Sequence, residues 1–159
     1  MVFSDRIKYV VFSPYWNLPM SIVKNEALPG LETNADYIED HNMDIRGEQN
    51  GLPIVRQRPG PRNALGRVKF IFPNKYSIYL HDTPSRQLFH KTVRAFSHGC
   101  IRVEDPFAFA SNLLSPQKAW TSQRIKDAMS SNSEQWVTLD KPTPVYITYS
   151  HAGQIQLET

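Results

Sequence analysis

The sequence predicts one α+β domain that is mostly β, and three observations support this. The chain has 159 residues, a length that favours a single domain able to bury its own core. Runs of β-branched and aromatic residues, which favour strands, occur in both halves of the chain. Two segments of the second half carry apolar residues at helical spacing, so a few helices are expected beside the strands.

The first predicted elements are a strand and a short helix. Residues 6–12 are β-branched and aromatic, and Pro14 ends the strand because proline cannot donate to a strand ladder. Pro19 suits the first turn of a helix, which is expected to continue through Ala27. The Pro-Gly pair at 29–30 predicts the end of that helix.

The segment 31–62 has a different composition from its surroundings. It is rich in Asn, Asp, Glu, Gly and Pro, and it offers few apolar anchors. Long loops inside compact domains are mostly binding loops, lids or disordered segments. The composition therefore predicts a loop-like insertion that either covers a site or remains disordered.

Two more strands are predicted after this insertion. Residues 66–72 and 76–81 have high β propensity, and residues 73–75 between them predict a tight turn. His81 then lies at a strand end, where the backbone holds an imidazole ring more rigidly than a loop does. Residues 84–90 predict one or two helical turns.

The rest of the chain predicts two helices and further strands. Asp105 is expected to cap a helix that has Pro106 at its first position, and a second helix is expected over 121–130. The first of these helices would pack behind the segment that precedes it, which contains the only cysteine. Strands are predicted near 135–139, 145–149 and 154–157.

The single cysteine, Cys100, stands in the run Ser97-His98-Gly99-Cys100-Ile101-Arg102, and His81 precedes it in the chain. A cysteine attacks as a thiolate and needs a neighbour that takes its proton or stabilises its charge. We therefore predict that Cys100 is a nucleophile and that His81 is its base. The alternative is that the thiol is a small buried apolar group and that the imidazole only stabilises a strand end.

Residues beside the nucleophile predict how such a reaction is supported. Gly99 has no Cβ, so its amide and that of Cys100 can point at one oxyanion. Arg102 adds a permanent charge that either stabilises the thiolate or binds a substrate carboxylate. His98 either completes the site or braces the turn, and bracing is preferred because one base suffices. A zinc site made of the two histidines and the cysteine is disfavoured, because the sequence has no compact Cys/His pair at metal spacing.

These motifs resemble the catalytic domain of L,D-transpeptidases, the YkuD family. The resemblance is carried by residues 97–102 together with Tyr79-Leu80-His81-Asp82-Thr83-Pro84. The segments 70–74 and 11–19 are similar to the large periplasmic branch of the family. The resemblance implies a β-sandwich or barrel with a few packed helices, in which residues 31–62 form a lid over the active site. It also implies that the first two or three strands of the domain are missing from this chain.

The same resemblance implies a reaction and its participants. Cys100 would attack the carbonyl of the third residue of a peptidoglycan tetrapeptide stem, and an acceptor stem would resolve the thioester into a 3→3 cross-link. The main-chain carbonyl of Asp82 would orient His81. Tyr79 lies two residues before His81 and so on the same strand face, where it either contacts the substrate or fills the core, and Ser97 is a further candidate for contact with the substrate. Carbapenem inhibitors would acylate the same cysteine. No metal or organic cofactor would be needed, and the location would be periplasmic.

Other functions of the same site stay open. It would be an L,D-carboxypeptidase if water resolves the thioester, or an enzyme that anchors or detaches a lipoprotein if a protein lysine does. A non-catalytic peptidoglycan-binding module is a further alternative. An endopeptidase of the papain or NlpC/P60 kind is disfavoured, because those enzymes place the cysteine before the histidine in the chain.

Composition argues against two classes of protein. The net charge of +3 comes from scattered Lys and Arg, without the aromatic-interleaved basic patch expected of a nucleic-acid binder. The longest apolar runs, 9–12 and 70–72, are far shorter than the roughly 20 residues that span a bilayer. Charged residues interrupt the first twenty positions, so export is expected to depend on a signal outside this chain.

Overall fold

The computed structural model describes residues 3–94 and 100–148 and confirms the predicted α+β, mostly β fold. Its largest element is a five-stranded sheet in the order β7-β6-β5-β1-β8. These strands are β1 (Phe3–Phe12), β5 (Val68–Ile71), β6 (Leu80–His81), β7 (Ile101–Arg102) and β8 (Gln135–Ile147). All neighbouring pairs in the sheet are antiparallel except β6 and β7, which run parallel.

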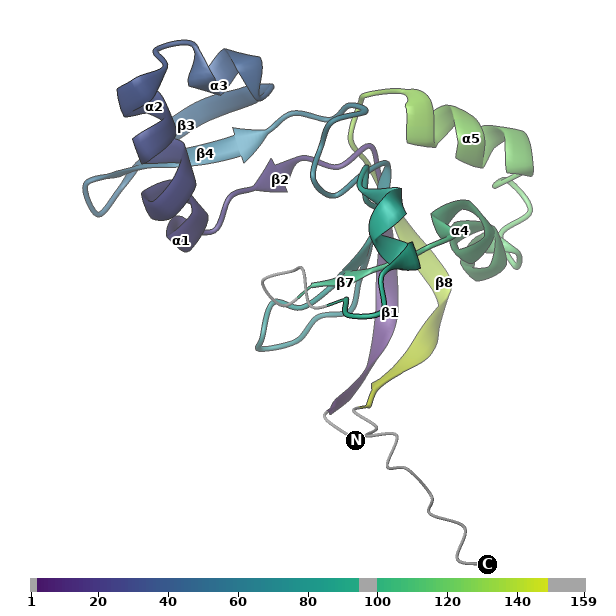
Figure 1. Cartoon of the computed structure of the whole chain (residues 1–159). Coiled ribbons are helices and arrows are strands. Elements are labelled where there is room, and N and C mark those ends of the chain that lie inside the picture. Colours follow the sequence, from purple (N-terminus) through teal and green to yellow (C-terminus); the bar gives the residue numbers. More distant parts are fainter. Residues whose placement is uncertain (1–2, 95–99, 149–159) are drawn as a thin grey trace, which may run out of the picture.

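One face of this sheet packs on two helices and forms the main core. The helices are α4 (Pro106–Leu114) and α5 (Ser122–Ser130), which lie on the same side of the sheet in Figure 1. The core includes Val10, Phe12, Val68, Phe70, Leu80, Val137 and Leu139 from the strands and Ala110, Leu113, Leu114 and Ile125 from the helices. Because side chains alternate along a strand, the residues between these core positions project from the opposite face of the sheet.

Both helices begin where the sequence predicts. The Asp105 side chain accepts a hydrogen bond from the Ala108 amide at 2.9 Å, and Pro106 occupies the first turn of α4. The Thr121 hydroxyl accepts a bond from the Arg124 amide at 3.2 Å at the start of α5. Such caps satisfy amides that have no partner inside the helix. No helix in the described part of the chain is long and apolar enough to cross a bilayer.

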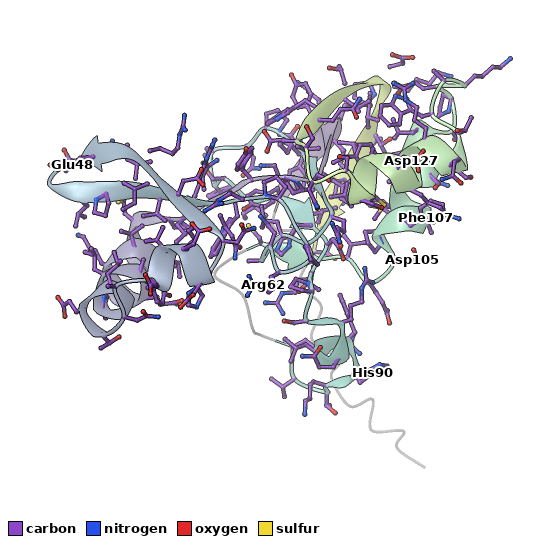
Figure 2. The ribbon with its side chains drawn as sticks, turned by 90° about the horizontal axis from the view of Figure 1, so that it is seen from above. Glu48, Arg62, His90, Asp105, Phe107 and Asp127 are labelled. Carbon is purple, nitrogen blue, oxygen red and sulfur yellow. The ribbon has the colours of Figure 1, made fainter. Side chains whose placement is uncertain are left out.

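Residues 16–57 form a second, smaller body, which we call the small lobe (Figure 1). It contains β2 (Trp16–Asn17), α1 (Met20–Ile22), the π-helical turn η1 (Val23–Ala27), α2 (Leu28–Thr33), α3 (Tyr37–Asp40), β3 (Met43–Gln49) and β4 (Leu52–Gln57). The strands pair in the order β2-β4-β3, and a separate apolar cluster fills the lobe. Seen from above in Figure 2, Glu48 marks the far end of the lobe and Asp127 on α5 lies at the opposite end of the molecule.

The segment 31–62 is therefore not the long loop that its composition suggests. Most of it is α3, β3 and β4, and its polar side chains cover the outside of the lobe. The β3–β4 hairpin turns at Asn50 and Gly51, whose φ angles are 54° and 75°. Two positive φ values are what a two-residue hairpin turn requires, and Asn-Gly adopts them readily.

The helix predicted to stop at Pro29-Gly30 continues instead to Thr33, so that boundary is wrong. The Leu28 amide bonds to the Val23 carbonyl in a π-type turn, and a new α-helical segment starts directly afterwards. Pro29 then lies in a first turn, where its missing N–H costs little. Gly30 serves packing, because a Cβ at this position would overlap the Tyr37 ring.

Two strand predictions also need correction. The strand expected over 76–81 is reduced to β6, because the Asn74 side chain holds a wider turn by bonding the Phe72 and Ile78 carbonyls, each at 2.7 Å. The strands expected at 135–139 and 145–149 are one strand, β8, whose pairing with β1 shifts register at a bulge. The helical turns expected after Pro84 are present as the 3-10 helix η2 (Arg86–His90), whereas the strand expected at 154–157 lies outside the described residues.

Asn63 ties together the two connections that join the small lobe to the sheet. Its side chain is fully buried and donates to the main-chain carbonyls of Pro14 (3.1 Å) and Arg58 (2.9 Å). The side-chain oxygen of Asn63, Oδ1, accepts a hydrogen bond from the Leu65 amide at 2.8 Å. One amide side chain thus fixes the entry and the exit of the lobe against each other.

We expect Asn63→Ala to lower the free energy of unfolding by about 2–4 kcal/mol, because it leaves buried main-chain groups without partners. Urea unfolding would measure this loss. The matched control is Asn34→Ala, which removes an exposed amide bonded to Asp40 and should cost less than about 1 kcal/mol. Equal losses in the two variants would contradict the assigned role of Asn63.

Candidate active site

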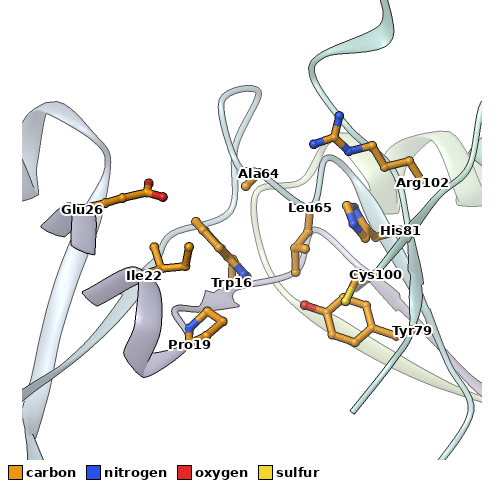
Figure 3. Close-up of a pocket in the computed structure, with 10 residues that line it drawn as sticks. All are labelled: Trp16, Pro19, Ile22, Glu26, Ala64, Leu65, Tyr79, His81, Cys100 and Arg102. Atoms are coloured by element: carbon orange, nitrogen blue, oxygen red, sulfur yellow. The ribbon is translucent and has the colours of Figure 1, made fainter. Parts of the chain in front are cut away.

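Four side chains of β6, β7 and the residues just before them face one pocket between the sheet and the small lobe (Figure 3). His81 pairs with Arg102 in the parallel register, so alternation places Tyr79 and Cys100 on the same face, one pair further back. The amide of Ile101 bonds to the Tyr79 carbonyl at 3.2 Å and fixes this register. The structure therefore brings four of the predicted site residues together.

The remaining walls of the pocket come from segments to which the sequence assigned no role in the site. Trp16, Pro19, Ile22 and Glu26 line it from the small lobe, and Ala64 and Leu65 line it from the connection back to the sheet. Its volume is about 240 Å³, just below the roughly 300–1,000 Å³ of typical ligand pockets. A pocket of this size suits a short segment of a larger substrate.

His81 is 5% exposed, and its Nδ1 faces the main-chain carbonyl oxygen of Asp82 at hydrogen-bonding distance. Burial lowers the pKa of His81 below its usual 6.5, the bond to Asp82 opposes this, and the charge of Arg102 lowers the pKa further. An imidazole that donates from Nδ1 to a carbonyl has its lone pair on Nε2. The geometry thus suits a neutral base.

The Asp82 carboxylate holds the backbone that orients His81. It is 2% exposed and accepts bonds from the Arg67 amide and from the Arg86 guanidinium, both at 2.9 Å. Gly66, at a φ of 66°, lies against this carboxylate, and a Cβ there would overlap it. These contacts position the Asp82 carbonyl, so the side chain of this residue acts indirectly on the imidazole.

The Tyr79 hydroxyl is hydrogen-bonded to the side chain of Cys100, and Figure 3 shows the sulfur next to the tyrosine ring. Burial raises the pKa of Tyr79, and the neighbouring Cys100 raises it further. The phenol therefore stays neutral and can donate a hydrogen bond to the sulfur. Its ring centroid lies 5.9 Å from that of His81, so the three side chains form one contiguous group.

Arg102 brings an unsatisfied cation to the same pocket. Its Nε and Nη1 atoms are buried and have no hydrogen-bond partner among the described residues. Buried donors without partners call for an explanation, and an anionic ligand group is one that fits a pocket-lining arginine. Glu26 lines the pocket from the lobe, on the opposite side in Figure 3. The pocket thus carries a positive charge on one wall and a negative charge on the other.

Three predicted site residues, Ser97, His98 and Gly99, lie outside the described residues, and their roles stay predictions. Within 3–94 and 100–148, no cluster of three or more His, Cys, Asp or Glu side chains is arranged to hold a metal ion. The described part of the pocket thus presents the thiol of Cys100, the imidazole of His81, the phenol of Tyr79 and the opposite charges of Arg102 and Glu26.

Comparison with known proteins identifies the family of this chain. The model of the YkuD family, described as the L,D-transpeptidase catalytic domain, matches residues 2–147. A Haemophilus influenzae protein described as "Putative L,D-transpeptidase" is 34% identical over 164 aligned positions, which cover 93% of this chain and 33% of that protein. The chain thus spans about a third of this relative's length. Since the family model covers nearly the whole chain, the protein belongs to the YkuD family of L,D-transpeptidase catalytic domains.

Proposed function

We propose that this domain transfers the acyl group of a peptidoglycan tetrapeptide stem through a thioester on Cys100 and forms 3→3 cross-links. The observation that carries the proposal is the shared pocket of Cys100 and a neutral, backbone-oriented His81. Family membership supports the class of reaction, and the pocket geometry supports the assignment of nucleophile and base.

In the proposed first half-reaction, Nε2 of His81 takes the thiol proton and the sulfur attacks the carbonyl carbon of the third stem residue. The carbon–nitrogen bond to the terminal D-Ala breaks, and His81 returns the proton to the leaving amine. In the second half-reaction, the amine of an acceptor stem attacks the thioester and His81 takes its proton. The new amide bond forms as the sulfur leaves, and the proton returns to the thiol.

The charges of the pocket favour a stem whose third residue is a diamino dicarboxylic acid such as diaminopimelate. Arg102 offers donors to a carboxylate, and Glu26 offers an acceptor to an ammonium group. The distal end of diaminopimelate carries both groups on one carbon. Such a stem would satisfy the guanidinium atoms that have no partner in the described part of the protein.

Two further expectations belong to this proposal. Because the substrate is a polymer of the cell wall, we place the working location in the periplasm. Carbapenems, which present a strained acyl group to the same thiol, are expected to leave a covalent adduct on Cys100.

The test is to incubate the chain with disaccharide tetrapeptides and to analyse the products by mass spectrometry. The proposal predicts a dimer joined between the third residues of two stems, with one D-Ala released per cross-link. Tripeptide as sole product would show a carboxypeptidase, and transfer of the stem to an added lysine-bearing peptide would show an anchoring enzyme. Absence of both turnover and a carbapenem adduct would favour a binding module.

A further inference from the structure

Lys69 lies in the centre of the five-stranded sheet, on the face that carries the pocket. The register pairs Lys69 of β5 with His81 of β6 on one side and with Val11 of β1 on the other. Its neighbours along β5, Val68 and Phe70, are fully buried in the main core, so its side chain projects from the opposite face. Lysine side chains are mostly exposed, whereas this one is half-buried on the pocket face of the sheet.

The Lys69 ammonium lies between two aromatic rings. Its Nζ is 5.7 Å from the Tyr79 ring centroid and 5.6 Å from the Trp136 ring centroid. Burial lowers the pKa of Lys69, while Glu134 and Cys100 act in the opposite direction and favour its charged form. The rings favour the cation as well, because an aromatic face attracts a positive charge. The Lys69 side chain thus lies against the Tyr79 ring and is not one of the described residues that line the pocket.

Tyr79 connects this cation to the nucleophile. One face of its ring meets the Lys69 ammonium, and its hydroxyl is hydrogen-bonded to the Cys100 side chain. A cation near a phenol draws electron density from the ring and makes the O–H a stronger donor. A stronger donor stabilises a thiolate more than it stabilises a neutral thiol.

We propose that Lys69 is a positioning residue for the nucleophile, which it supports through Tyr79 by favouring the thiolate of Cys100 and by holding the phenol against the sulfur. The inference rests on the proposed role of Cys100 and goes beyond it, because it adds a cation on β5 to the base on β6. Lys69 is not one of the described residues that line the pocket. It would therefore act on the sulfur and not on the substrate.

A test must separate the effect of Lys69 on the Cys100 thiol from the effects of the other polar side chains near the sulfur. Among the described residues that share the pocket with the sulfur, Tyr79 lies just before β6, His81 lies on β6, Arg102 lies on β7, and Glu26 lies across the pocket. Lys69 itself faces Glu134, next to β8. A change at residue 69 should therefore alter the reactivity of the thiol while His81 and Arg102 remain in place.

The experiment measures the rate at which iodoacetamide alkylates Cys100 as a function of pH, in the intact chain and without any peptidoglycan substrate. Lys69→Met keeps the length of the side chain and removes its charge. We expect the midpoint of the profile to move up by about one pH unit, which makes alkylation at pH 7 up to about tenfold slower. Lys69→Arg should restore most of the wild-type profile.

Two comparisons make the result specific. Lys75→Met removes an ammonium that lies 5.0 Å over the Tyr76 ring, the same kind of contact in a turn away from the pocket, and should leave the profile unchanged. In a Tyr79→Phe background, Lys69→Met should have a much smaller effect, because the hydroxyl that carries the influence is gone.

Coincident profiles for Lys69→Met and wild type, with equal thermal stability, would overturn the inference. So would a full Lys69→Met effect in the Tyr79→Phe background, since it would show that the charge does not act through the phenol. Alkylation needs no turnover, so these outcomes are distinct from the failure of the proposed transpeptidation. A shifted profile in a chain that forms no cross-links would support Lys69 and reject only the proposed reaction.

Discussion

Cys100→Ala is expected to abolish both turnover of tetrapeptide stems and covalent modification by a carbapenem. The chain has no other cysteine, so no second thiol can replace the lost nucleophile. Loss of a covalent nucleophile commonly costs ~10³-fold or more, because the remaining groups can only bind and polarise the substrate. Intact-protein mass measures the adduct, and product analysis measures turnover.

Cys100→Ser is the informative companion to the alanine variant. It keeps a hydroxyl at the same position, but an alcohol is far less acidic than a thiol and a single imidazole activates it poorly. We expect residual activity below about one hundredth of wild type, with a folded chain because residue 100 is only half-buried. Wild-type adduct formation in Cys100→Ala would show that the acyl group is carried elsewhere.

The helices of the large body could be predicted because their boundaries are encoded locally. Asp105 with Pro106, and Thr121 at the next helix, are caps whose hydrogen bonds reach only three residues along the chain. The end of the lobe helix could not be predicted by the same reasoning. Its π-type turn shifts the hydrogen bonding just before Pro29, and Gly30 is needed for a contact with Tyr37.

The hairpin of the small lobe has one local signal in the sequence. Asn50-Gly51 is the dipeptide most typical of a two-residue hairpin turn, and it stands between the two segments that form β3 and β4. The surrounding strands are polar because most of their side chains are exposed, so hydrophobic alternation gives little indication of them. Composition alone therefore predicted a loop where a hairpin exists.

Some residues of the candidate site could be predicted from the sequence and others could not. Tyr79, His81, Cys100 and Arg102 could be proposed from two short motifs, and the parallel pairing of β6 with β7 explains why these motifs meet. The pocket walls from residues 16–26 could not be proposed, because their place depends on how the small lobe is fixed to the sheet. Lys69 was missed for a similar reason: its role depends on register across neighbouring strands, which a single sequence does not specify.

His81→Gln is expected to lower the rate of acyl transfer by about 10²–10⁴-fold, the usual contribution of a positioned base. Glutamine is polar and of similar length, but it cannot take the thiol proton. The wild-type enzyme should also stay active at moderately acidic pH, because burial lowers the pKa of His81 below 6.5 and keeps the imidazole neutral. The acid limb of kcat/KM should therefore lie below pH 6.5, and the residual activity of the variant should lack it.

The lowered pKa of His81 has a second measurable consequence, in the stability of the fold. Below pH 6.5 the unfolded chain binds a proton at this histidine before the folded chain does, so the free energy of unfolding must fall as pH falls through that window. Urea unfolding at pH 7 and pH 5 should show a smaller loss for His81→Gln than for wild type. The matched control is His41→Gln, whose exposed ring makes the same kind of contact, from Nδ1 to the Tyr37 carbonyl at 2.8 Å, outside the pocket. If His41→Gln altered the pH dependence as strongly as His81→Gln, the effect could not be assigned to burial beside Cys100, and the neutral base would lose its main support.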